Sequence, residues 1–232
     1  MERGHPIRRA WHQQKFARIL GCLPDGPNQS ILDVGCFAGS FLSLLPQERY
    51  SRQVGVDILP DQIAYAREHF ATPFRTFEHV SSIEGISGIP GTFDCATLIE
   101  VIEHLHPHEL DEMFRQVVAK VRPGGLIAMS TPNYTSTWPL LEVMLNRVSD
   151  VTYDEQHVTR FTYWNGPQKL MKLAPALKEH CELTLRTTTH FVSPFLAVFG
   201  LGFSNRVSHA VPHSLWTFPF GNLLLMVFQK RG

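Results

Sequence analysis

The chain has 232 residues, of which 44% are hydrophobic and 18% are charged, and its formal net charge is zero. This length suits one sizeable α/β domain with its own core. The neutral balance excludes an overall basic field of the kind that attracts nucleic acid, although a local basic patch stays open. No apolar run reaches the ~18 residues that a helix needs to span a bilayer, so we expect no transmembrane segment.

The N-terminal region and the cysteines indicate a cytoplasmic protein. The first residues are polar and basic rather than apolar, so we expect no signal peptide. Four cysteines are scattered along the chain without the spacing of metal ligands, which is typical of a reducing compartment. They are Cys22, Cys36, Cys95 and Cys181.

Residues 30–39 form the most informative stretch. Ile31, Leu32 and Val34 are an apolar run with a β-branched bias, which predicts a buried strand of a parallel sheet. Gly35 ends this strand, Gly39 follows four residues later, and apolar residues at helical spacing come next. A strand, a glycine turn and a helix start bring backbone N–H groups close to a ligand.

A second short strand, Gln53–Asp57, ends in a carboxylate about twenty residues further on, where an acidic residue suits the two hydroxyls of a ribose. Hydrophobic periodicity and turn residues predict the other elements. Helices are expected over Ile7–Leu20, Asp61–Phe70 and Pro107–Arg122, and strands over Phe74–Val80, Phe93–Glu100, Leu126–Thr131, Glu182–Thr189 and Asn222–Gln229.

The glycine turn and Asp57 together resemble the cofactor site of class I S-adenosylmethionine (SAM) methyltransferases. Phe93–Glu100 is similar to the fourth strand of that family, and Val121–Thr131 to the turn into its fifth strand. The resemblance implies an α/β, Rossmann-like fold of seven strands, with a central, mostly parallel sheet and helices on both faces. A nicotinamide or flavin site is the alternative, but Gly-x-Gly-x-x-Gly is absent.

One methyltransferase domain is expected over residues 1–232. Its parts are an N-terminal helix and loop (1–29), a SAM-binding core (30–133), a substrate-side insert or lid (134–165) and a C-terminal part with an antiparallel edge hairpin (166–232). The apolar segment 191–221 has three interpretations: packing under a long connection, a dimer face, or a greasy surface for a lipid-like substrate or peripheral membrane contact. The oligomeric state is not readable from the sequence.

The resemblance also implies cofactor contacts. Phe37 departs from the family, which usually has a third glycine there, and its bulk is expected to narrow the methionine end of the pocket. Ser82 lies near the place where the family has an acid that bonds the adenine amino group. The residues expected around SAM are Asp33, Gly35 and Gly39 at the methionine end, Asp57 at the ribose, Ile58 and Ser82 at the adenine, and Ile99 beside the cofactor.

The chemistry is expected in the segment Glu100-Val-Ile-Glu103-His104. If the chain turns helical after the fourth strand, Glu100, Glu103 and His104 share one face and can hold Mg²⁺ or Mn²⁺. His157 is a further candidate, as a fourth ligand or as a general base. Two metal-free alternatives stay open: His104 as the base, or local hydrogen bonds only, with His157 ordering its loop.

Two subfamilies share this segment: ubiquinone-biosynthesis O-methyltransferases and small-RNA 3′-end 2′-O-methyltransferases. The second group also has a run similar to Ser130–Asn133. The neutral charge argues against RNA, so we expect O-methylation of a small, partly apolar acceptor. The alternatives are metal-dependent methylation of an RNA 3′ end and a non-catalytic SAM-binding protein.

Overall fold

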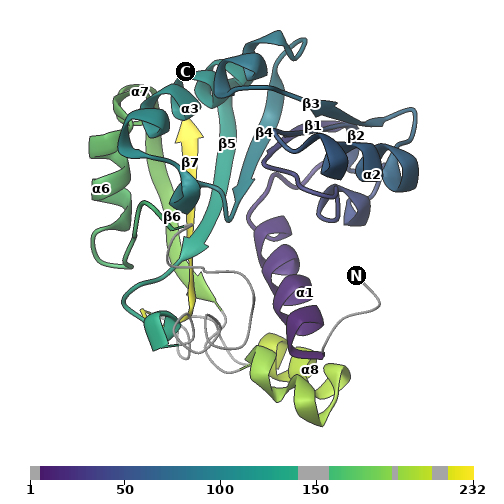
Figure 1. Cartoon of the computed structure of the whole chain (residues 1–232), viewed down its shortest axis with the longest axis vertical. Helices are drawn as coiled ribbons and strands as arrows, with labels where there is room; N and C mark the ends of the chain where they lie inside the picture. The colour runs from purple at the N-terminus through teal and green to yellow at the C-terminus, as the bar shows by residue number, and fades with distance from the viewer. Residues whose placement is uncertain (1–5, 141–156, 190–192, 211–218) are drawn as a thin grey trace.

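The computed structural model describes residues 6–140, 157–189, 193–210 and 219–232. Its centre is a seven-stranded sheet in the order β3-β2-β1-β4-β5-β7-β6, in which β7 runs antiparallel to its two neighbours (Figure 1). The strands are β1 Gln29–Val34, β2 Tyr50–Asp57, β3 Arg75–His79, β4 Phe93–Ile99, β5 Val121–Pro132, β6 Cys181–Thr189 and β7 Leu223–Lys230.

Helices and shorter 3₁₀ turns connect these strands. The α-helices are α1 Pro6–Leu20, α2 Pro60–Phe70, α3 Pro107–Lys120, α6 Gly166–Leu173, α7 Pro175–His180 and α8 Leu201–Ala210. The 3₁₀ turns are η1 Leu42–Leu44, η2 Ile83–Gly88, η3 Ile102–His104 and η4 Ser193–Phe199.

The strand order confirms the predicted Rossmann-like fold. β1 lies between β2 and β4, so the direction of winding reverses at this point. Ligands of open α/β sheets bind in the crevice at the carboxyl ends of the strands beside such a reversal. The predicted antiparallel pair at the sheet edge is also confirmed, because β7 pairs with both β5 and the edge strand β6.

Apolar side chains cover both faces of the sheet. On one face, α3 buries an apolar stripe that runs from Leu110 to Val118, together with residues of α6 and α7. On the other face, Phe16 and Ile19 of α1 pack with Ile63 of α2 and with η1. The sheet is therefore buried between two layers, which fixes the positions of its strand ends.

The helix expected directly after Gly39 is wrong, because the structure has the single 3₁₀ turn η1 there. Pro46 lacks an N–H and disfavours helical backbone in the preceding residue. Leu45 is accordingly extended, with φ −81° and ψ 129°. The connection from the glycine turn to β2 is therefore short.

The segments η4 and α8 pack against α1, which extends past the strand ends (Figure 1). The Gln14 amide of α1 donates to the Ser204 hydroxyl at 2.9 Å. Phe199 keeps 76% of its surface exposed and Phe203 46%, so the contact interpretations of segment 191–221 stay predictions for its described part. Residues 211–218, like residues 141–156 of the expected lid, lie outside the described residues. Among the helices described, none is long and apolar enough to cross a bilayer.

A buried polar pair joins the two central strands. Asp33 of β1 and Thr97 of β4 are register partners, and the Thr97 hydroxyl donates to Asp33 Oδ1 at 2.6 Å. Burial raises the pKa of Asp33 to about 7, although the bond from Thr97 opposes this rise. The negative charge of Asp57 adds to the rise, and the positive charge of Lys15 offsets part of it.

We expect Asp33 to make the stability of the fold depend on pH. An unfolded aspartate ionises near pH 4, whereas folded Asp33 does so near pH 7. Asp33 therefore makes its full contribution to the free energy of unfolding below about pH 4, and this contribution is lost as the pH rises through about 7. The loss is at most about 1.4 kcal/mol per pH unit. Asp33→Asn keeps an acceptor for Thr97 and should remove this dependence.

Urea unfolding between pH 4 and pH 8 measures the effect. The free energy of unfolding of the wild type should fall relative to that of Asp33→Asn over this range. Glu182→Gln, which changes an exposed acid of β6, is the matched control. Parallel curves for the wild type and Asp33→Asn would contradict the role of Asp33.

Candidate active site

The glycine turn after β1 depends on both of its glycines. Gly35 has φ 73° and Gly39 has φ 74°, in the left-handed region that favours glycine. A Cβ atom on Gly35 would lie 2.4 Å from Val101 Cγ2, and one on Gly39 would lie 2.6 Å from Phe77 Cε1. The sequence can therefore keep this turn, with its backbone close to the strand ends, only with glycine at these two positions.

Phe37 stands where the methyltransferase family usually has a third glycine, and its backbone is left-handed, with φ 47°. This conformation costs a side-chain-bearing residue roughly 1–2 kcal/mol. Its N–H donates to Asp57 Oδ2 at 2.8 Å, and its side chain is 55% exposed. The turn thus keeps a glycine-like backbone while it presents an aromatic ring at the surface.

Asp57 is fixed at the end of β2 by two backbone amides. Its Oδ2 accepts from Phe37, and its Oδ1 accepts from the N–H of Leu59 at 2.9 Å. Each carboxylate oxygen has two acceptor sites, so one on each stays available to a ribose hydroxyl. Ile58 is 61% exposed and Leu59 44% exposed beside it. An oriented carboxylate next to exposed apolar side chains fits the nucleoside part of SAM.

The other residues expected around the cofactor lie at different depths. Ile99 is half-buried at the end of β4, and Ser82 is exposed just before η2, close to the end of β3. Asp33 is 2% exposed and bonds to Thr97, so it supports the turn from beneath. The contacts proposed for these three residues stay predictions.

The chain direction changes sharply after β4. Glu100 has φ 55°, and its N–H donates to the Ser130 carbonyl at 2.9 Å. Only the short turn η3 follows, so the expected helical face shared by Glu100, Glu103 and His104 is wrong. A left-handed residue cannot continue a right-handed helix, so Glu100 does not share a helical face with Glu103 and His104.

Glu103, His104 and His157 form a compact cluster. One ligand atom of each lies within 4.8 Å of the others. The backbone N–H of Thr159 donates to the Glu103 carbonyl at 3.0 Å, which ties the segment of His157 to η3. The His157 Nδ1 atom and the Tyr134 hydroxyl are 2.9 Å apart.

The buried carboxylate of Glu103 is suited to bind a metal ion. Its side chain is 1% exposed, and its Oε2 atom has no hydrogen-bond partner in the described part of the chain. Burial raises the pKa of Glu103 to about 8, and the nearby charge of Glu100 adds to this effect. A buried, unpaired carboxylate oxygen beside two imidazoles fits a divalent cation. Of the four predicted ligands, the structure brings these three together and leaves out Glu100.

Glu100 instead forms an ion pair with Lys15 of α1. Burial disfavours the charged form of Glu100, but the ammonium of Lys15 outweighs it and lowers the pKa of Glu100. The Lys15 side chain is only 4% exposed. Sequence reasoning missed this residue, although a signal exists, since Lys15 falls between Trp11 and Ile19 at intervals of four on an apolar stripe.

Aromatic side chains surround the cluster. Trp11 of α1 lies 5.8 Å from Trp138, centroid to centroid, and Trp138 lies 6.1 Å from His157. The Tyr134 ring meets the His157 ring edge-on at 6.4 Å. His157 therefore lies near the flat rings of Tyr134 and Trp138, in a partly apolar environment.

Comparisons with known proteins identify relatives of this chain. A family model described as a methyltransferase domain matches residues 7–182. A ubiquinone biosynthesis O-methyltransferase of Xanthomonas campestris pv. campestris is 32% identical over 111 residues, which cover 47% of this chain and 45% of that relative. A ubiquinone biosynthesis O-methyltransferase of Methylocella silvestris is 36% identical over 107 residues, which cover 45% of this chain and 40% of that relative. The matched part thus spans less than half the length of these curated relatives.

Solved structures share the fold. The methyltransferase domain of bacterial CtHen1-C has a TM-score of 0.63 at 18% identity, covering 95% of this chain and 99% of that chain. The N-methyltransferase NodS of Bradyrhizobium japonicum WM9, in complex with S-adenosyl-L-homocysteine (SAH), has a TM-score of 0.60 at 17% identity. The match covers 99% of this chain and 90% of that chain. Since the family model matches more than half of its length, this chain belongs to the methyltransferase domain family, and its fold is that of the class I SAM-dependent enzymes.

Proposed function

We propose that this chain transfers the methyl group of SAM to an oxygen atom of a small, partly apolar acceptor. The observation that carries the proposal is the Asp57 carboxylate, which two backbone amides orient beside the glycine turn. The choice of oxygen draws on relatives named as O-methyltransferases and on the cluster of Glu103, His104 and His157.

Positioning accounts for much of this reaction. The sulfonium of SAM already activates the methyl group, so the protein must align the acceptor and handle its proton. Asp57 would accept hydrogen bonds from the two ribose hydroxyls, and Ile58 would pack against the adenine. Fixing the nucleoside in this way holds the sulfonium end close to the turn between Gly35 and Gly39.

His157 is suited to accept the proton of the acceptor hydroxyl. When its Nδ1–H donates to the Tyr134 oxygen, His157 is in the neutral tautomer whose Nε2 has the lone pair that a general base needs. Tyr134 and Trp138 restrict the orientation of the ring. His104 is the second candidate base in the same cluster.

A divalent cation, Mg²⁺ or Mn²⁺, is the second way to handle the proton. Glu103, His104 and His157 would hold it, and Glu103 offers the buried oxygen that lacks a partner. When bound, such an ion lowers the pKa of a hydroxyl that it contacts. Glu100 is not counted as a ligand, because Lys15 neutralises it.

The aromatic surroundings support a flat, partly apolar acceptor. Trp11, Trp138 and Tyr134 offer ring faces and edges near His157. The metal-ligand cluster also favours a second candidate, 2′-O-methylation of an RNA 3′ end, which the resemblance of the segment around Glu103 implies. Transfer assays with catechol and with a short RNA, each with Mn²⁺ or with EDTA, separate the two functions.

Asp57→Ala should weaken the binding of SAH by about 100-fold, because hydrogen bonds to a charged group contribute roughly 1.5–3 kcal/mol. Asp57→Asn keeps one acceptor oxygen and should lie between this variant and the wild type. Isothermal titration calorimetry measures the affinity, and Asp61→Ala, an exposed acid of α2, is the control. Unchanged affinity in a folded Asp57→Ala protein would remove the ribose assignment.

Glu103→Gln should weaken the binding of Mn²⁺ by at least about tenfold, because a neutral amide is a poorer ligand for a hard cation. Electron paramagnetic resonance of free Mn²⁺ measures the affinity directly. Glu109→Gln, which changes an acid in the first turn of α3, is the control. If the wild type binds no Mn²⁺, the metal part of the proposal fails, and methyl transfer in EDTA should then depend on His157.

A further inference from the structure

The Lys15 side chain reaches from α1 into the acidic end of the site. It is 4% exposed, and its ammonium pairs with Glu100 Oε2. Burial raises the pKa of both Asp33 and Glu103, and the positive charge of Lys15 partly offsets this rise in each. A single ammonium therefore acts on acids at the ends of β1 and β4.

This ammonium occupies the electrostatic role that a bound metal ion would have. Glu103, His104 and His157 have ligand atoms within 4.8 Å of one another. Glu100, three residues before Glu103, would supply a second carboxylate, but its charge is already neutralised. An ammonium and a divalent cation repel each other strongly where both are shielded from water.

We propose that Lys15 is the resident counter-ion of Glu100 and competes with a divalent metal for that carboxylate. The metal binds weakly while Lys15 holds Glu100, and tightly when Glu100 is released to join the other three ligands. The position of α1, which carries Lys15, therefore sets the metal affinity of the site. The competition rests on the metal site proposed above.

Lys15→Met keeps the length and the packing of the side chain but removes the charge. It should bind Mn²⁺ at least about tenfold more tightly than the wild type, because one carboxylate is freed and one repulsion is lost. Lys15→Arg should stay close to the wild type. The double variant Lys15→Met/Glu100→Gln should bind Mn²⁺ no more tightly than the wild type. It also removes the unpaired charge of Glu100, so it serves as the test if Lys15→Met alone folds poorly.

Electron paramagnetic resonance of Mn²⁺, without SAM or acceptor, gives the affinities, and melting temperatures check the fold. Equal affinity in Lys15→Met and the wild type would overturn the competition while the metal site stands. A gain that persists in the double variant would overturn the role of Glu100. No binding in any variant would show that the metal site itself is wrong.

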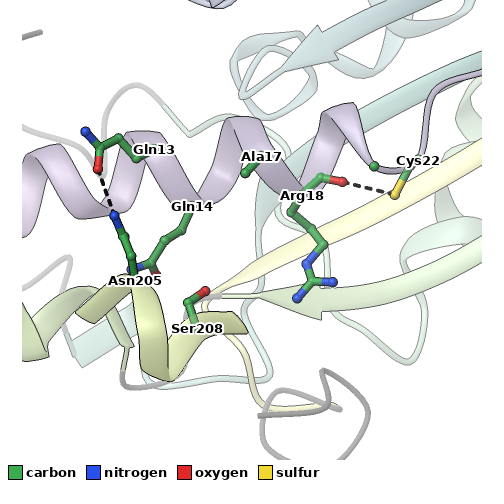
Figure 2. Close-up of a pocket in the computed structure, with 8 residues that line it drawn as sticks. Gln13, Gln14, Ala17, Arg18, Cys22, Asn205 and Ser208 are labelled. Carbon is green, nitrogen blue, oxygen red and sulfur yellow. Dashed lines mark hydrogen bonds between the residues drawn. The ribbon is translucent and has the colours of Figure 1, made fainter. Parts of the chain in front are cut away.

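A separate cavity of about 460 Å³ lies between α1 and α8 (Figure 2). None of its lining residues belongs to the cofactor site or to the Glu103 cluster. Figure 2 shows Arg18 of α1 and Ser208 of α8 facing the same space. The lining residues are Gln13, Gln14, Ala17, Arg18, Gly21, Cys22, Asn205 and Ser208.

Among the described residues of this lining, Arg18 is charged and the others are neutral. Its guanidinium makes no hydrogen bond or ion pair with any residue in the described ranges. Burial lowers the pKa of Arg18, which shows that the charged form is poorly solvated there. A guanidinium that is half-buried and unpaired matches carboxylate and phosphate groups, which it binds through two parallel hydrogen bonds.

The geometry points to a binding site for a small oxyanion, a carboxylate or a phosphate, held by Arg18. The Ser208 hydroxyl and the Asn205 amide lie in the same lining and supply neutral polar partners. The cavity adjoins α1 on the side of Arg18, so an anion there would also brace α1 against α8.

Calorimetric titrations with inorganic phosphate and with acetate test this site and distinguish the two anion classes. Arg18→Gln should weaken the binding of the preferred anion by at least about tenfold, because a charge-assisted bidentate contact is lost. Arg206→Gln, which changes an exposed arginine of α8 outside the lining, should bind like the wild type. No binding to the wild type, or equal binding by Arg18→Gln, would overturn the inference.

Discussion

The two hydrogen bonds that backbone amides donate to Asp57 fix the carboxylate on which the proposed cofactor site depends. The bond from Phe37 joins the turn after β1, where Phe37 is left-handed, to the end of β2. The bond from Leu59 lies within the connection from β2 to α2. Hydrogen bonds to a charged acceptor contribute roughly 1.5–3 kcal/mol each, which is comparable with the cost of one left-handed residue, roughly 1–2 kcal/mol. The same bonds orient the carboxylate that we propose as the ligand of the ribose hydroxyls.

Among the described residues around this turn, acidic side chains outnumber basic ones. Acids stand at the ends of three neighbouring strands, Asp33 and Asp57 on β1 and β2 and Glu100 just after β4, with buried Glu103 in η3. Lys15 is the cation that the described structure pairs with one of them. SAM carries a sulfonium, an ammonium and a carboxylate, so its net charge is positive, as is that of a divalent ion. A site that gathers four carboxyl groups and the paired ammonium of Lys15 among the described residues therefore favours a positively charged ligand.

Much of the fold was readable from the sequence, and the failures have physical causes. The strands from Ile31 and Gln53 and the stripe on α3 were predictable because periodicity and burial agree there. The helix after Gly39 failed because Pro46 limits that segment to one 3₁₀ turn. The left-handed backbone of Glu100 could not be predicted, since nothing in a glutamate marks φ 55° and tertiary hydrogen bonding imposes it. The place of Asp57 at the end of β2 could be anticipated, whereas the pairing of Glu100 with Lys15 joins segments 85 residues apart.

Helix α1 links the parts of the molecule that concern function. Trp11, Lys15 and Arg18 follow one another at intervals of four and three, so they lie on one broad side of the helix. Trp11 contacts the aromatic group at Trp138, Lys15 contacts the acid after β4, and Arg18 faces the cavity against α8. Because one helix carries all three side chains, a shift of α1 would change the surroundings of Trp138, the pairing of Glu100 and the cavity together. Occupancy of the cavity would thereby couple to the acidic site without any direct contact between them.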